Sequence, residues 1–159
     1  MQLEFPVYGV EGEQAAFANC MVIRARNSHE DPIRVGHLVV LDPQKNACHS
    51  VAAREQIEMC ALGIVLSDGQ ENEFGLGETV RVLRRGRVYV HLDSAVEAAG
   101  DSVFVNFQTG GFCGKQTTDT VQLTQAFFLS AGKSSDVILL ELDLLPKDYR
   151  DEDYCRTRV

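Results

Sequence analysis

The chain has no long apolar run, and this absence excludes membrane-spanning helices. No stretch approaches the roughly 20 apolar residues that such a helix needs. The first residues, MQLEFPVYGVEGE, also lack a basic segment followed by an apolar one, which a secretory signal would show. We therefore expect a protein that is neither inserted in a membrane nor secreted.

The cysteines show no pairing pattern, which argues against a disulfide framework or a zinc knuckle. There are five, an odd number, and no Cys-x-x-Cys motif occurs among them. We interpret them as small buried or half-exposed thiols in a reducing cytosol. The cysteines are Cys20, Cys48, Cys60, Cys113 and Cys155.

The chain also lacks an excess of positive charge. It has 15 Lys and Arg against 23 Asp and Glu, for a net charge of −8 and a pI near 4.9. Binding to nucleic acid phosphates needs the opposite sign, so we expect no nucleic acid partner. With 45% apolar residues, a chain of 159 residues is expected to form one soluble domain that buries about 70% of its unfolded surface.

What the sequence does contain is alternation typical of β-strands. Val80 and Val82 alternate with less apolar neighbours, and Val88 and Val90 repeat the pattern. Arg84-Arg85-Gly86 lies between these two runs and predicts a hairpin turn. Residues 53–57 are expected to form a loop or one helical turn. The expected strands cover residues 20–25, 35–41, 58–66, 78–83, 87–92, 102–107, 121–129 and 136–144.

These runs predict an all-β fold, a jelly-roll-like sandwich or barrel of about 8–10 short antiparallel strands. Residues 1–19 show neither helical nor strand periodicity over any length, and they are expected to be an N-terminal arm. Residues 20–145 form the β domain. Residues 146–159 are almost wholly charged and predict a tail that a partner would order.

Candidate catalytic and ligand-binding groups are few. The segment from Gly111 to Gln116 lacks the first Gly and the final Ser or Thr of a phosphate loop. His91, Asp93 and Ser94 have the residue types of a hydrolytic triad, but neighbours on a strand are expected to face opposite ways. We therefore expect no enzyme activity and no cofactor.

Histidine and cysteine side chains offer only weak candidates for metal ligands. Cys48, His49 and Cys60 could supply soft ligands, but the His-x-His pair of a metal-binding barrel is absent. His29 and His37 are interpreted as solvated or singly hydrogen-bonded. We expect no metal site.

Four arginines, Arg81, Arg84, Arg85 and Arg87, cluster in seven residues of an otherwise acidic chain. They could dock an acidic partner through directional guanidinium contacts. Alternatively, they are solvated and pair with nearby acids such as Glu78. Both interpretations stay open at the level of sequence.

The order of these features resembles the capsid cement or head decoration proteins of tailed phages, of the Gp24-like and Bordetella-phage-like kind. The resemblance covers about 140 residues and excludes the tail after Pro146. It is carried by FPVY at 5–8, RVG at 34–36, GIV at 63–65, GETVRV at 77–82, GRVYV at 86–90, AGDSVFVN at 99–106, TGGF at 109–112, FF at 127–128 and VIL at 137–139.

The resemblance implies a virion protein on the outer surface of the capsid, made in the host cytoplasm. It implies binding to the major capsid protein, bridging of neighbouring capsomers, and self-association as a homodimer or homotrimer. The aromatic residues Phe5, Tyr8, Tyr149 and Tyr154 are the predicted interface anchors, and Arg84, Arg85 and Arg87 the predicted polar docking residues. A fibre or neck component, or a soluble β-barrel that binds or converts a small ligand, are the alternatives.

Overall fold

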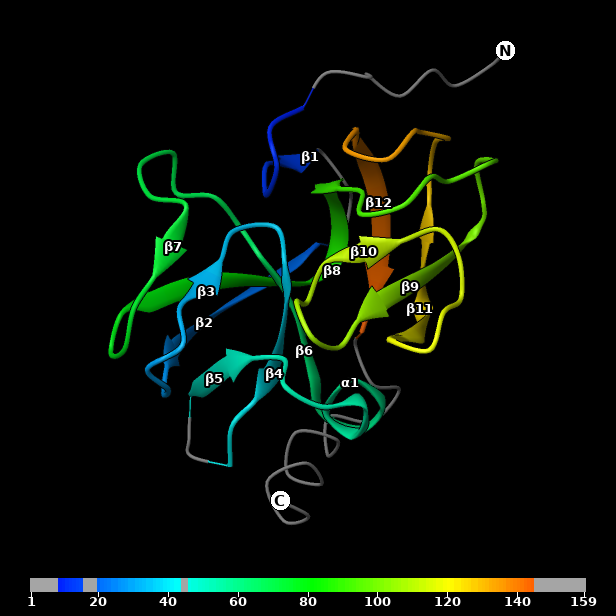
Figure 1. Ribbon diagram of the computed structural model, residues 1–159. Helices are drawn as coiled ribbons and strands as arrows, with labels where there is room; N and C mark the ends of the chain where they lie inside the picture. The colour runs from blue at the N-terminus through cyan, green and yellow to red at the C-terminus, as the bar shows by residue number, and fades with distance from the viewer. Residues whose placement is uncertain (1–8, 16–19, 44–45, 145–159) are drawn as a thin grey trace.

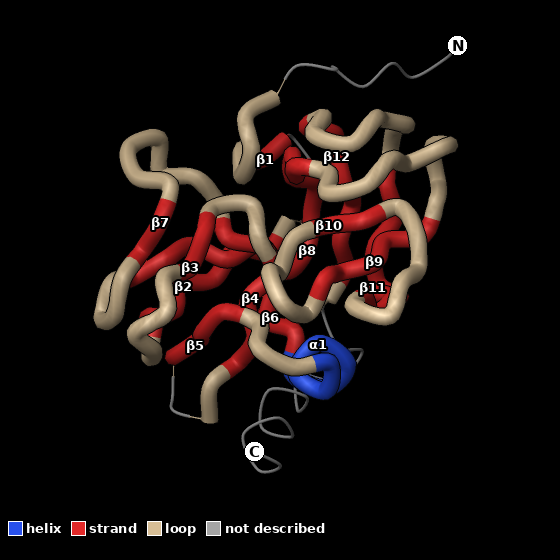
Figure 2. The backbone as a smooth tube through the Cα atoms, in the orientation of Figure 1, coloured by secondary structure: helices blue, strands red, loops and turns tan. Residues whose placement is uncertain are grey.

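A computed structural model describes residues 9–15, 20–43 and 46–144, and β-strands dominate this part of the chain (Figure 2). The strands are β1 (Gln14–Ala15), β2 (Met21–Asn27), β3 (Ile33–Arg34), β4 (Leu38–Leu41), β5 (Ala47–Ser50), β6 (Ala61–Val65), β7 (Glu73–Phe74), β8 (Thr79–His91), β9 (Ser102–Asn106), β10 (Phe112–Cys113), β11 (Thr120–Phe128) and β12 (Val137–Asp143), with one helix, α1 (Arg54–Cys60). The prediction of an all-β fold is confirmed. None of the described helices is long and apolar enough to cross a membrane.

The 13-residue strand β8 is the centre of the fold. Its first half pairs with β2 and β6, and its second half pairs with β12 and β1. Figure 1 shows β8 in the middle, with β2, β3, β5 and β7 on one side and β9 to β12 on the other. The hairpin predicted at Arg84-Arg85-Gly86 is therefore wrong, because the chain continues through Gly86 as one strand.

Five strands close into a small barrel, which we call the first barrel. The order is β8, β2, β5, β4 and β6, and β6 returns to β8 through the pairs Ile64–Leu83 and Val65–Val82. Its interior is lined by one cluster of buried residues, which includes Val39, Leu62 and Val82. The pairing of β2 with β5 is parallel, which departs from the purely antiparallel sheet that the sequence predicts.

The other strands form a second, nearly closed barrel on the opposite edge of β8. The order is β8, β12, β11, β9 and β10, and Leu92, just after β8, forms a bridge with Phe112 of β10. The larger cluster of buried residues fills this second barrel and extends toward α1, with Phe112 and Phe128 fully buried. β8 is thus a wall of both barrels.

The helix α1 is longer than predicted. The sequence analysis expected a turn over residues 53–57 followed by a strand, whereas the helix continues to Cys60 and β6 starts at Ala61. The Gln56 side-chain oxygen accepts hydrogen bonds from the backbone N–H groups of Ala52 and Ala53, at 2.8 and 3.0 Å. Ile57 and Cys60 are buried on one face, so capping and packing together stabilise the turn.

Candidate functional site

The predicted docking arginines lie on β8, where β12 pairs with it. Arg85 is opposite Asp143 and Arg87 is opposite Glu141 in this antiparallel pair. The distances are 3.8 Å for Arg85 Nε to Asp143 and 2.9 Å for Arg87 Nε to Glu141. Both arginines therefore pair with acids, although these belong to β12 and are not Glu78, whose carboxylate accepts a hydrogen bond from the Gly75 N–H.

Arg84 has a different position, because it points into the protein and is only 5% exposed. Its guanidinium donates hydrogen bonds to the carbonyl oxygen of Leu62 at 3.1 Å and to that of Leu144 at 3.0 Å. These carbonyls belong to β6 and to the residue after β12. Arg84 therefore joins the first barrel to the residue after the last strand of the second. Docking of a partner by Arg84, Arg85 and Arg87 stays a prediction.

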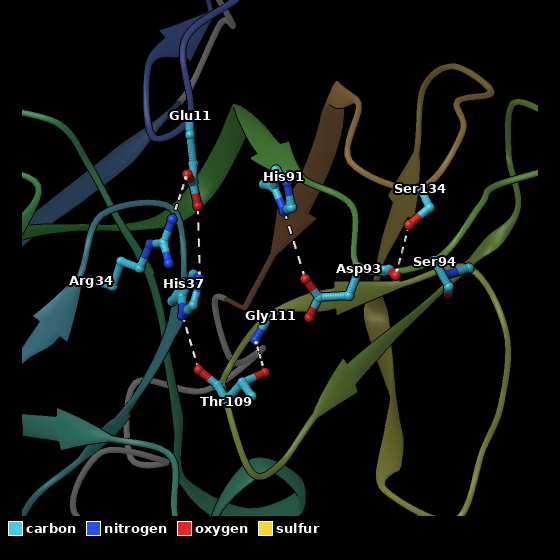
Figure 3. A network of polar contacts seen from close by, with 10 residues as sticks. Glu11, Arg34, His37, His91, Asp93, Ser94, Thr109, Gly111 and Ser134 are labelled. Carbon is cyan, nitrogen blue, oxygen red and sulfur yellow. Dashed lines mark hydrogen bonds and ion pairs between the residues drawn. The ribbon is translucent and has the colours of Figure 1, made fainter.

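The described part of the N-terminal segment is attached to its own domain. The Gly12 N–H donates to the Tyr89 carbonyl at 2.8 Å, and the Ser67 N–H donates to the Gly12 carbonyl at 2.9 Å. In Figure 3 the Glu11 carboxylate points toward Arg34 and His37, at 3.7 and 3.8 Å. This segment is therefore held by backbone bonds and by charge.

His37 lies under this segment and links it to the second barrel. Its Nδ1 donates a hydrogen bond to the Thr109 carbonyl oxygen at 2.9 Å, which leaves Nε2 facing Glu11. Burial lowers the pKa of His37, and the nearby Glu11 carboxylate opposes that effect in part. The half-buried imidazole therefore prefers the neutral form.

His91 and Asp93 come together, and Ser94, the residue next to Asp93, makes a separate contact. Residues two apart on a strand share a face, and Asp93 Oδ1 lies 3.6 Å from His91 Nδ1 (Figure 3). The Ser94 hydroxyl instead accepts a hydrogen bond from the Gly114 N–H at 3.0 Å, and the Ser134 hydroxyl donates to the Asp93 carbonyl. These contacts join the loops at this end of the second barrel.

Sequence reasoning missed a cluster of two histidines and one aspartate beside β2, β4 and β5 of the first barrel. One possible ligand atom from each of His29, Asp42 and His49 lies within 4.8 Å of the others. These three residues are the group in the described ranges whose donor atoms are close enough to share an ion. No spacing in the sequence indicates the cluster, because strand pairing brings its members together.

The sequence of this chain matches one known protein family. A profile of the family described as "Structural cement protein (E217 gp24/Pam3 gp6)" matches residues 3–143, which is most of the chain. The chain belongs to this family of phage structural cement proteins. No curated protein sequence matches this cement protein.

Several solved structures resemble the fold of the cement protein, and two of them are phage proteins. A chain in the capsid of Myoviridae phage XM1 is 13% identical with a TM-score of 0.69, covering 89% of this chain and 94% of that one. The base of the head fibre gp8.5 of bacteriophage phi29 is 11% identical with a TM-score of 0.51, covering 81% and 98%. At such low identity, these structures support the all-β architecture alone.

The family establishes a role as a capsid cement protein, associated with the virion shell. It is a family of structural proteins. Arg84 and Arg87, two of the predicted docking residues, make contacts within the domain. The predicted aromatic anchors Phe5, Tyr8, Tyr149 and Tyr154 lie outside the described residues. Their contribution to an interface stays a prediction.

Proposed function

We propose that this cement protein binds the major capsid protein on the outer surface of the shell and bridges neighbouring capsomers. The observation that carries the proposal is the family match over residues 3–143. The net charge of −8 supports an orientation away from packaged nucleic acid, because phosphates would repel an acidic surface. Synthesis in the host cytoplasm, followed by addition to the shell, is consistent with thiols that form no disulfide among the described residues.

The two ends of the chain would serve as clamps and the barrels as a rigid platform. In this proposal Phe5 and Tyr8 anchor the N-terminal end, and Tyr149 and Tyr154 anchor the charged tail at 146–159. The backbone bonds of residues 9–15 to β8 and Ser67 support it, because they fix the point from which the N-terminal end departs.

Arg85 is the better of the two partly exposed arginines for polar docking. Its side chain is 37% exposed and its contact with Asp143 is long, whereas Arg87 forms a short, less exposed pair with Glu141. A carboxylate on the capsid could replace Asp143 at Arg85 at little cost, because exposed ion pairs contribute only about 0–1 kcal/mol.

Self-association as a homodimer or homotrimer would let one assembly reach several capsomers. Each specific contact would need on the order of 1,000 Å² of buried surface, and several contacts acting together would resist dissociation far better than one. Val10, Leu76 and Phe127 are large apolar side chains that the isolated chain leaves exposed, and they would contribute to such contacts.

The test is binding of purified protein to capsid shells that lack it, measured by co-sedimentation and imaging. A variant without residues 146–159 should keep the melting temperature of the full chain and bind shells at least tenfold more weakly. Arg85→Gln should weaken binding less, and Gln122→Ala, an exposed change on β11, is the matched control. Unchanged binding by the truncated variant would remove the tail from the mechanism.

Imaging of the decorated shells separates the proposal from its nearest rival. Density spread over the outer surface at contacts between capsomers supports cement binding. Density confined to a single vertex, or to the base of a projecting fibre, would instead indicate a fibre or neck component and would contradict the bridging role.

A further inference from the structure

Three strand ends meet at one edge of the first barrel and bring together two imidazoles and a carboxylate. His49 lies in β5, Asp42 follows β4, and His29 follows β2 by two residues. The Ser28 N–H donates to the Cys48 carbonyl at 2.9 Å, and the Asp42 N–H donates to the Ala47 carbonyl at 3.0 Å. Because β5 pairs with both β2 and β4, the backbone fixes the Cα positions of His29, Asp42 and His49 relative to one another.

The turn that carries His29 is itself held in place. The Asn27 side chain is fully buried and donates hydrogen bonds to the carbonyls of Asp31 and Phe74, at 3.1 and 3.0 Å. Its oxygen accepts a hydrogen bond from the His29 N–H at 3.1 Å. The position of His29 is therefore set by the protein interior, while its side chain, 51% exposed, can still rotate.

The two more buried members have the hydrogen-bond partners that metal ligands usually have. His49 is 7% exposed, and its Nδ1 donates to the Ser50 carbonyl at 2.9 Å, which leaves an electron pair on Nε2. Asp42 is also 7% exposed, and its Oδ2 accepts a hydrogen bond from the Ser28 hydroxyl at 2.8 Å. A carbonyl behind the imidazole and a hydroxyl behind the carboxylate orient ligands in known metal sites.

We propose that His29, Asp42 and His49 form a binding site for a first-row divalent transition metal ion, with Zn²⁺ as its best-suited occupant. Two imidazoles and one carboxylate favour such ions over Mg²⁺ and Ca²⁺, which prefer sites made wholly of oxygen ligands. Water would complete the coordination, because three protein ligands leave a position open.

Binding requires a small movement, which falls on His29. The His29 and His49 imidazoles are stacked, with centroids 4.1 Å apart and planes 2° from parallel, so their nitrogen electron pairs do not converge. His29 Nε2 already lies 3.4 Å from Asp42 Oδ2. That is near the separation of about 3.4 Å between two ligands of a tetrahedral ion with bonds of about 2.1 Å. Rotation of the exposed His29 imidazole would then aim its nitrogen at an ion held by Asp42 and His49.

The experiment is titration of the full chain with Zn²⁺ at pH 7 by calorimetry, using protein without a histidine tag and treated with chelator. Cys20 and Cys155 are replaced by Ser in every sample, because the exposed Cys20 is a competing zinc ligand. We expect one Zn²⁺ per chain and a rise in melting temperature, with no response to Mg²⁺. Co²⁺ should give visible absorption bands typical of a site with nitrogen ligands.

His29→Gln is the decisive variant, because an exposed turn residue can be replaced without harm to the fold. It should weaken Zn²⁺ binding at least tenfold, and Ser28→Ala should weaken it about tenfold by releasing Asp42. His91→Gln is the matched control, since His91 and Asp93 form a similar pair at 3.6 Å. It should leave Zn²⁺ binding unchanged.

Two outcomes would overturn the proposal. One is the absence of saturable Zn²⁺ binding, in which case His29 and Asp42 make a direct polar contact only. The other is equal binding by the parent and by His29→Gln, which would place the ion elsewhere on the chain. Neither outcome bears on the cement role, because capsid binding is measured separately and in the presence of chelator.

Discussion

At the scale of single residues, Arg84 is a buried cation that serves the fold. The guanidinium donates to the carbonyls of Leu62 and Leu144, so one side chain satisfies acceptors from two distant parts of the chain. Such charge-assisted bonds inside a protein are stronger than neutral ones.

Arg84→Ala should lower the free energy of unfolding by roughly 3 kcal/mol, because two hydrogen bonds to a charged group are lost. Urea denaturation measures the change. Arg84→Lys should be intermediate, since an ammonium lacks the planar fork that reaches both carbonyls. Arg85→Ala is the control and should cost at most about 1 kcal/mol. Equal losses for Arg84→Ala and Arg85→Ala would contradict a structural role for Arg84.

His37 should make stability depend on pH. Because burial lowers its pKa, the unfolded chain binds a proton more readily than the folded chain. The stabilising contribution is therefore present above the ordinary pKa of about 6.5 and is lost as the pH falls through the lower pKa of the folded state. The melting temperature should decline as the pH falls below about 6.5.

His37→Asn tests this origin, because the amide can still donate to the Thr109 carbonyl but does not titrate. The decline in melting temperature between pH 7 and pH 5 should be shallower in this variant than in the parent. His91→Asn, which changes a histidine that is 38% exposed, is the control. Identical pH profiles for His37→Asn and the parent would exclude His37 as the source.

At the scale of elements, closure of the first barrel depends on close approach of β6 to β8. A side chain at Gly63 would run into the Leu83 carbonyl oxygen and come within 2.7 Å of Val82 Cγ1. The absence of a side chain at Gly63 is what allows the pairs Ile64–Leu83 and Val65–Val82 to form.

Gly63→Ala should destabilise the protein by about 1–3 kcal/mol, the usual cost of forcing extra atoms into a packed interior. Thermal unfolding followed by circular dichroism measures it. Gly75→Ala is the matched control, because nothing lies within 4 Å of the added carbon there. The control should change stability by less than about 0.5 kcal/mol. A similar small change for Gly63→Ala would show that the barrel can open at this seam.

Strand alternation was enough to predict most elements of the second barrel. The expected strands at 102–107, 121–129 and 136–144 agree with β9, β11 and β12 to within one residue at each end. The hairpin predicted at Arg84-Arg85-Gly86 was wrong, because a glycine between charged residues can also lie within a long strand. In β8 this segment lies where the pairing changes from β2 and β6 to β12 and β1. The pairing of β8 with four other strands is a long-range property that no local pattern carries.

The sites were predicted less well than the strands, and for the same reason. Arg84 looks like a surface residue by type, and hydrogen bonds to the carbonyls of Leu62 and Leu144, distant in the sequence, help to make its burial possible. The cluster of His29, Asp42 and His49 depends on β5 pairing with β2 in parallel and with β4 in antiparallel. The family resemblance, by contrast, predicted the role directly, because it depends on the order of many short motifs.

At the scale of the whole molecule, the two barrels should unfold together. Each needs β8 as a wall, so neither can lose its strands without exposing the core of the other. Scanning calorimetry should show one transition, with equal calorimetric and van't Hoff enthalpies. Two resolved transitions would mean that β8 can leave one barrel while it remains in the other.

The shared strand also has a mechanical consequence if the protein bridges capsomers as proposed. If neighbouring capsomers pull on opposite halves of the molecule, the tension runs along β8 and is spread over its ladders with β1, β2, β6 and β12. Ladders loaded along their length must slip as a group, whereas a strand pulled from its end peels one bond at a time. A single continuous strand would thus let a small protein resist a pulling force that shorter, separate strands could not.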